Sequence, residues 1–69
     1  MSREFSVVIE RDSDGMLIAS VPNLRGCHSQ ASSQDELMIR IKEAIELCLE
    51  VEDAEITEFV GVQRVAITA

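Results

Sequence analysis

The segment SQDELMIRIKEAIELCLE, residues 33 to 50, decides the fold because it is the clearest structural signal in the chain. Ser33 and Glu36 form a capping box, in which the serine hydroxyl accepts from the first helical N–H groups and Glu36 is expected to reach back. Asp35 and Glu36 also suit the positive end of a helix dipole. Apolar residues then recur at helical spacing: Leu37, Ile41, Ala44, Ile45 and Cys48. The segment predicts one amphipathic helix that ends between residues 49 and 52.

The residues before this helix predict β-structure. Phe5–Glu10 is rich in β-forming residues, and Asp12–Gly15 is a turn sequence in which glycine can take positive φ. Met16–Val21 is a nearly continuous apolar run, so we expect the two flanking segments to pair as a β-hairpin. Cys27–Ala31 follows as a short third strand.

Beyond the helix, Val60–Thr68 is apolar and β-branched, which predicts a fourth strand. The element order is then β-β-β-α-β in a single domain, residues 1–69. We expect an α+β fold, with a mostly antiparallel four-stranded sheet and one helix packed on one face. Because the strands carry apolar residues on both faces, the uncovered face should be an interface. This predicts a homodimer or a higher homo-oligomer.

The charge balance limits the partners of the chain. Thirteen acidic residues stand against six basic ones, for a net charge of −7 in 69 residues. This charge repels a phosphate backbone, and only Phe5 and Phe59 could stack on bases, so we expect no direct nucleic-acid binding. An acidic domain suits a basic protein partner, although acidity also simply maintains solubility. With no apolar run long enough for a signal peptide or a membrane span, we expect a cytoplasmic protein without a membrane partner.

The stretch VPNLRGCHS, residues 21 to 29, gathers reactive residue types but is typical of a structural connection. Pro22 should end the second strand, and Gly26 should take a backbone angle that other residues resist. Cys27 is expected to face the core, as free cysteines usually do. His28, the next residue in the strand, would then face outward, so a catalytic Cys–His pair is disfavoured.

Metal sites and catalysis have no positive support in the sequence. A calcium loop at Asp12 and Asp14 would lack its bidentate glutamate. Zinc needs three or four ligands, whereas Cys27 and His28 are adjacent and Cys48 lies far along the chain. Two cysteines could pair, but so small a number favours reduced thiols. We therefore expect no cofactor and no enzymatic activity.

Taken together, these motifs resemble the HicB antitoxin family. The resemblance rests on the Asp14–Gly15 hairpin, on Val21–Ser29, where members typically show VPDLPGC, and on the capped helix with Glu43-Ala44-Ile45. It covers residues 4 to about 50 well and the last strand only loosely. The order and spacing of several separate motifs make it fairly specific.

The resemblance implies a partial RNase H-like domain without the catalytic carboxylates. Such domains bind and cover HicA, a small basic ribonuclease toxin with a double-stranded-RNA-binding-like fold. Many members also carry a C-terminal DNA-binding domain, whereas this chain stops at Ala69, so we expect no transcriptional repression by the chain itself. Asn23 replaces the usual Asp and Arg25 the usual Pro, with no evident chemical consequence.

The family's toxin-contact residues form no motif that could be mapped, so candidates come from surface chemistry. They are the acidic residues Glu10, Asp12, Asp14, Glu43, Glu46 and Glu50, together with His28 as an outward-facing side chain. A solvated surface is the competing interpretation of each. Two other functions stay open. One is an orphan homo-oligomeric adaptor with no toxin. The other is a small nuclease, which would need several carboxylates converging on a metal.

Overall fold

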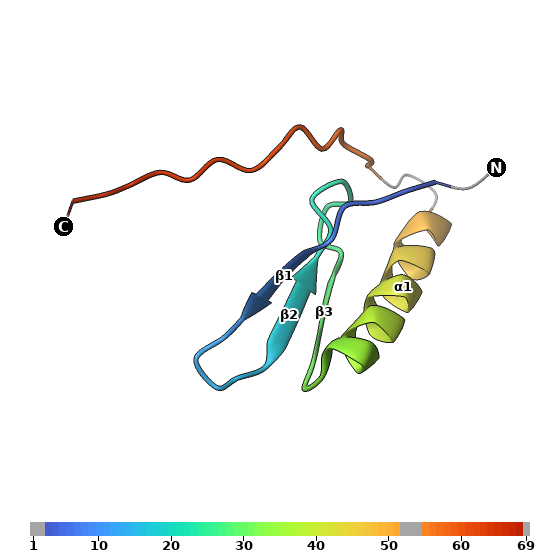
Figure 1. The fold of residues 1–69 in the computed structure, drawn as a ribbon. Coiled ribbons are helices and arrows are strands. Elements are labelled where there is room, and N and C mark those ends of the chain that lie inside the picture. Colours follow the sequence, from blue (N-terminus) through green and yellow to red (C-terminus); the bar gives the residue numbers. More distant parts are fainter. Residues whose placement is uncertain (1–2, 52–54, 69) are drawn as a thin grey trace.

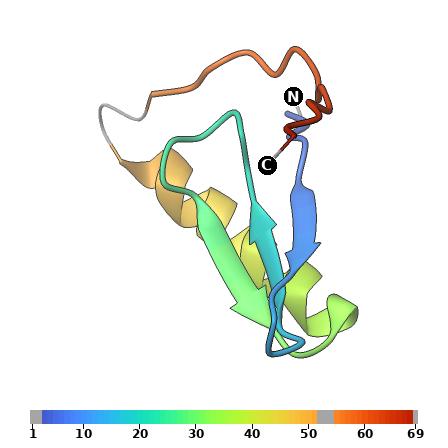
Figure 2. The ribbon, with the colours of Figure 1, turned by 90° about the vertical axis from the view of Figure 1, so that its left-hand side faces the viewer.

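The computed structural model describes residues 3–51 and 55–68. Three strands, β1 (Val8–Arg11), β2 (Leu17–Ser20) and β3 (His28–Ala31), precede one helix, α1 (Gln34–Glu50). The strands form an antiparallel sheet in the order β1-β2-β3. The helix lies across one face of this sheet (Figure 1, and from the side in Figure 2). The α+β class, the hairpin, the third strand and the helix are therefore confirmed, with each strand shorter than predicted.

The predicted hairpin turn forms through one aspartate. The Oδ1 atom of Asp12 accepts from the backbone N–H groups of Asp14 and Met16, each at 2.9 Å. Gly15 has φ +87°, which an L side chain rarely adopts. Asp12 is thus engaged inside the turn, while Asp14 is exposed. The turn sets the register in which Glu10 lies opposite Ile18.

The helix begins where the capping residues predict. Ser33 Oγ accepts from the backbone N–H of Glu36 at 3.3 Å. The Glu36 carboxylate, which was expected to reach back to Ser33, instead forms an ion pair with Arg40 one turn later. An exposed pair of this kind adds little stability, so the serine supplies the cap and the apolar stripe holds the helix on the sheet.

One side of α1 packs against β3 and β2 but does not contact β1. Leu37 and Ile41 are 0% and 1% exposed, and they are the largest fully buried side chains of the described residues. The rest of the core comes from the inner sheet face and from the loop before β3: Ala19, Val21, Leu24, Cys27 and Ala31. On β1, Ile9 faces the same side as its partner Ala19, yet it stays 40% exposed because no helix covers it.

The predicted fourth strand is not part of the sheet. Residues 59–68, which we call the arm, run in an extended path past the end of the sheet (Figure 1). Val60 and Ile67 are 92% and 80% exposed. β-Branched composition favours an extended backbone, but a strand also needs a partner for its N–H and C=O groups. The described sheet therefore has three strands and does not complete the partial RNase H-like order.

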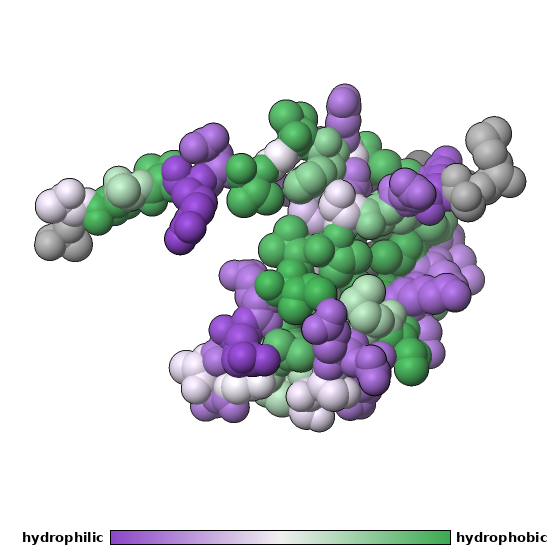
Figure 3. All heavy atoms as spheres, in the orientation of Figure 1, coloured by the Kyte–Doolittle hydropathy of each residue, from purple (hydrophilic) through white to green (hydrophobic). Residues whose placement is uncertain are grey.

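The apolar residues of the outer sheet face are less exposed than those of other regions. Val8 and Ile18, on the sheet face that the helix does not cover, are half-buried. Among the described residues, the large exposed apolar side chains are Ile9, Val51 and Ile56 and those of two regions, the outer side of α1 and the arm. The space-filling view shows the arm's apolar atoms standing clear of the body (Figure 3). An interface formed by apolar surface would thus use the helix or the arm.

Two leucines of α1 test this account of the core. Leu37→Ala should lower the free energy of unfolding by about 2–5 kcal/mol because it leaves a cavity between helix and sheet. Leu47 is 64% exposed on the same helix. Leu47→Ala should change stability by no more than about 0.5 kcal/mol. Urea titrations followed by circular dichroism measure both, and equal losses would contradict the packing described.

Candidate protein-binding surfaces

The outer side of α1 carries acidic and apolar residues together. Leu37 and Ile41 face the sheet, so residues half a helical turn away face solvent. Ile39 and Leu47 are 63% and 64% exposed there. We call this surface the acidic helix face, and it comprises Ile39, Glu43, Glu46, Leu47 and Glu50. Three predicted contact residues therefore share one surface. The apolar side chains on the same surface, Ile39 and Leu47, were not predicted from the sequence to be contact residues.

The outer face of the sheet holds two of the other predicted contact residues. Val8, Ser20 and His28 form one cross-strand row, and Glu10, Ile18 and Gln30 form the next. His28 is exposed on this face and Cys27 is buried, which confirms their predicted directions. Glu10 and His28 share the face but lie on β1 and β3, separated by β2.

The predicted contact residues thus divide between two sides of the molecule. The acidic helix face points away from the sheet, whereas Glu10 and His28 lie on the sheet face that the helix does not cover. Asp12 and Asp14 lie in the turn between β1 and β2. A partner of limited size that binds the helix face would therefore not touch the outer sheet face.

The loop after β2 holds the segment that leads into the arm. The backbone N–H of Thr57 donates to the Asn23 carbonyl at 2.7 Å, and the Thr57 hydroxyl donates to the Pro22 carbonyl at 3.0 Å. The Asn23 Nδ2 group donates to the Thr57 carbonyl at 3.1 Å. Leu24, buried beneath the loop, forms an isolated antiparallel bridge with Ile56. We call these contacts the arm clamp.

The arm clamp gives a role to two residues for which the sequence indicated none. The side chain of Asn23 donates a hydrogen bond to Thr57, which the aspartate typical of the family could not do. Arg25 lies 3.5 Å from Glu55, an ion pair that proline could not make. The expectation that these replacements lack a chemical consequence was therefore wrong for Asn23, whereas the exposed Arg25–Glu55 pair adds little. The contacts join residues more than thirty positions apart, so local patterns gave no signal for them.

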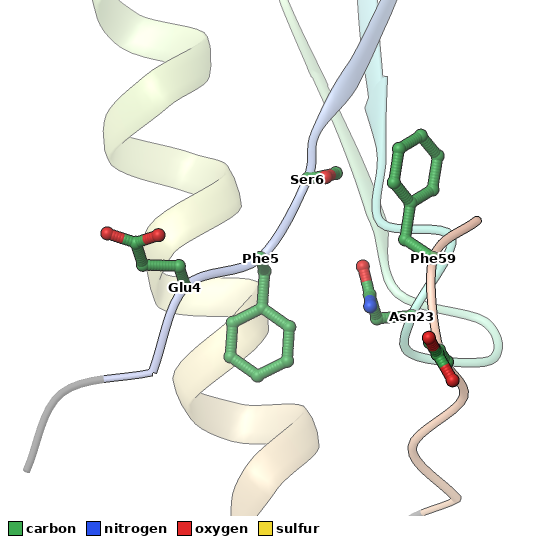
Figure 4. Close-up of a pocket in the computed structure, with 6 residues that line it drawn as sticks. Glu4, Phe5, Ser6, Asn23 and Phe59 are labelled. Atoms are coloured by element: carbon green, nitrogen blue, oxygen red, sulfur yellow. The ribbon is translucent and has the colours of Figure 1, made fainter. Parts of the chain in front are cut away.

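A hollow of about 390 Å³ lies beside the arm clamp. Figure 4 shows Asn23 between the segment that carries Phe5 and the segment that carries Phe59. The remaining lining residues are Glu4, Ser6 and Glu58. Its lining has more polar than apolar surface and includes two carboxylates, so it does not resemble the apolar pocket that a small molecule usually needs.

The thiols form a structural pair. Both are free, with Cys27 buried and Cys48 half-buried. Burial raises the pKa of the Cys27 thiol to about 11, and a hydrogen bond and charge interaction with Cys48 act in the same direction. Cys27 therefore stays protonated near neutral pH, and a protonated thiol is a poor nucleophile and a poor metal ligand.

Within residues 3–51 and 55–68, no cluster of three or more His, Cys, Asp or Glu side chains could hold a metal ion. The same part of the chain has no helix that is long and apolar enough to cross a bilayer. The described residues present three solvent-facing surfaces: the acidic helix face, the outer sheet face and the exposed arm.

Comparison with known proteins places these features in a family. The family model for the HicB_like antitoxin of bacterial toxin-antitoxin systems matches residues 5–67. The chain belongs to the HicB-like antitoxin family. The match includes the arm clamp and most of the arm. It therefore extends beyond residue 50, where the resemblance seen in the sequence motifs became loose.

Two relatives of this HicB-like chain match it over nearly their whole length, and a third matches it over about two thirds. A UPF0150 protein of Archaeoglobus fulgidus is 57% identical over 65 residues, which cover 93% of this chain and 94% of the relative. UPF0150 protein ssr1258 of Synechocystis is 53% identical over 66 residues, or 94% and 96% of the two chains. A Thermoplasma acidophilum UPF0150 protein is 40% identical over 47 residues, 68% of each.

Asn23→Asp tests the arm clamp. A carboxylate would face the Thr57 carbonyl without a proton to donate, so the clamp should open more often. We expect the Thr57 amide to exchange with solvent roughly fivefold faster, measured by NMR hydrogen exchange. Arg25→Ala is the control, because the Arg25 side chain is 85% exposed and its ion pair should contribute little. Equal exchange in Asn23→Asp and the unmodified protein would contradict the clamp.

Proposed function

We propose that this HicB-like chain is an antitoxin domain that binds a small basic ribonuclease toxin of the HicA type and covers its active surface. It performs no chemistry of its own. Family membership supports an antitoxin role. The observation that carries the proposal further is the acidic helix face, where three carboxylates surround two exposed apolar side chains.

The composition of the helix face suits a basic partner for two separate reasons. Glu43, Glu46 and Glu50 would attract and orient an RNA-binding protein, mainly by raising the association rate. Ile39 and Leu47 would supply the apolar contacts that hold the complex once it has formed. A toxin covered in this way could not reach RNA. The net charge of −7 also argues that the chain binds the toxin rather than nucleic acid. We place this action in the cytoplasm, where such a toxin would meet its RNA.

A homo-oligomeric adaptor without a toxin is the second candidate. It is favoured by the apolar arm, whose valines and isoleucine are each at least 75% exposed. An oligomer would present several acidic helix faces at once and so bind multivalent partners. The two functions differ in one respect that can be measured: only the antitoxin requires a toxin encoded by a neighbouring gene.

Co-expression tests the antitoxin function. The chain should restore growth to cells that express a small basic toxin encoded beside its own gene, and the two purified proteins should form a complex that stops RNA cleavage. If growth is not restored and no complex forms, or if no such neighbour exists, the antitoxin proposal fails and the adaptor takes its place.

A pair of charge-matched variants locates the contact surface. Glu43→Lys with Glu46→Lys changes the net charge by the same amount as Glu10→Lys with Asp14→Lys. The long-range electrostatic attraction to a basic toxin therefore falls equally in both variants. Any remaining difference between their dissociation constants reports direct contact. We expect the helix pair to raise the dissociation constant of the toxin complex at least about tenfold more than the hairpin pair. The reverse order, measured by calorimetry, would assign the contact to the hairpin and outer sheet face.

A further inference from the structure

The arm is a segment of ten residues, 59–68, that belongs neither to the core nor to the acidic helix face. Its side chains at Val62 and Val65 are 77% and 75% exposed. Yet its composition is that of a strand, because β-branched residues make up half of it along an extended backbone. Such a segment has the sequence of a strand without a neighbour, and an unpaired strand is a template for pairing with another chain.

The sheet has one open edge and one obstructed edge. β1 and β3 are the edge strands. At β3, the Arg40 guanidinium reaches from α1 and donates to the Gln30 carbonyl at 3.0 Å, and the helix packs on this side. At β1 no described strand pairs with the outer edge, and Ile9 is left 40% exposed on the inner face. A strand added to the sheet would therefore fit beside β1, where it would cover Ile9.

Apolar character also favours β1 as the receiving edge. Arg64 is the only charged residue between positions 59 and 68, so the arm is nearly uncharged. On the β1 side, Arg11 and Arg3 balance Glu10 and Glu4, so the edge has no net charge that would repel the arm. The arm is thus complementary to this edge in apolar character and in its unpaired backbone groups.

The arm clamp directs the arm away from its own sheet. Thr57 is fixed to Pro22 and Asn23 at the end of β2 by backbone and side-chain hydrogen bonds. From there the arm continues past the end of the sheet and does not turn alongside β1 of the same chain (Figure 1). The exposed arm and the open edge therefore belong to the same molecule but do not meet in it.

We propose that the arm of one chain pairs with the open edge of β1 in a second copy, and that the exchange is reciprocal. Two chains then form a symmetric dimer in which each sheet gains its fourth strand from the partner. The added strands bury apolar residues that a chain of this size cannot bury alone. The proposal does not depend on a toxin, and it names both the segment and the edge that an oligomer would use.

Sedimentation equilibrium of the full chain and two lysine variants tests the exchange. The unmodified protein should be a dimer at micromolar concentration. Val65→Lys should raise its dissociation constant roughly a hundredfold, because each dimer loses two buried valines. Leu47→Lys is the matched control: it adds the same charge at a similarly exposed apolar site, on α1. We expect Leu47→Lys to leave the dissociation constant unchanged within about threefold.

Each outcome decides the proposal. A monomer at all concentrations would overturn it, whether the arm stays free or pairs with β1 of its own chain. A dimer weakened by Leu47→Lys and not by Val65→Lys would assign the interface to the helix and overturn it as well, as would a dimer that neither variant affects. Because Val65 is 75% exposed in the single chain, circular dichroism should show the fold of Val65→Lys intact.

Discussion

The packing of Leu37 and Ile41 against the sheet is the interaction on which the rest of the structure depends. The two side chains are the largest that this small chain buries completely. Each contributes on the order of 1.5–3 kcal/mol through burial alone. They pack over an inner face that contains Ala19 and Ala31, whose small side chains let the helix approach closely. This contact fixes the helix over β2 and β3, and it leaves β1 beyond the reach of the helix.

The free surfaces of the molecule follow from that placement. With its apolar stripe buried, α1 must direct the opposite side to solvent, so the acidic helix face is a consequence of the packing. With the helix displaced toward β3, the β1 edge stays open, and Arg40 closes the other edge. The placement of α1 over β2 and β3 therefore separates two sites: the acidic helix face, proposed to bind a toxin, and the β1 edge, proposed to bind a second copy. Both sites could be occupied at the same time.

The elements that depend on local chemistry could be predicted from the sequence. The turn at Asp12, the cap at Ser33 and the stripe through Leu37 each follow from neighbouring residues. The inward direction of Cys27 follows from the usual burial of free cysteines, and the outward direction of His28 from strand alternation. The predictions that were wrong concern contacts between residues far apart in the sequence. The pairing of the last strand needs a partner that its own composition cannot specify.

The arm clamp shows the same limit at the level of single residues. Asn23 and Thr57 are ordinary loop residues by local criteria, and only the fold brings them together. The division of the candidate contact residues between two sides of the molecule required the position of the helix. The apolar members of the acidic helix face, Ile39 and Leu47, were missed because they fall outside the stripe that marks a core.

The most direct test of this account is hydrogen exchange at the backbone amides of β1 over a range of protein concentrations. If the partner's arm occupies this edge, the outward-pointing amides of Val8–Arg11 should exchange slowly in concentrated solution and speed up on dilution, while those of β3 stay unchanged. Fast exchange at every concentration would show that the edge is never filled. Slow exchange at every concentration, in a chain that sedimentation shows to be a monomer, would show that the edge is filled within a single chain, and either result would contradict the account.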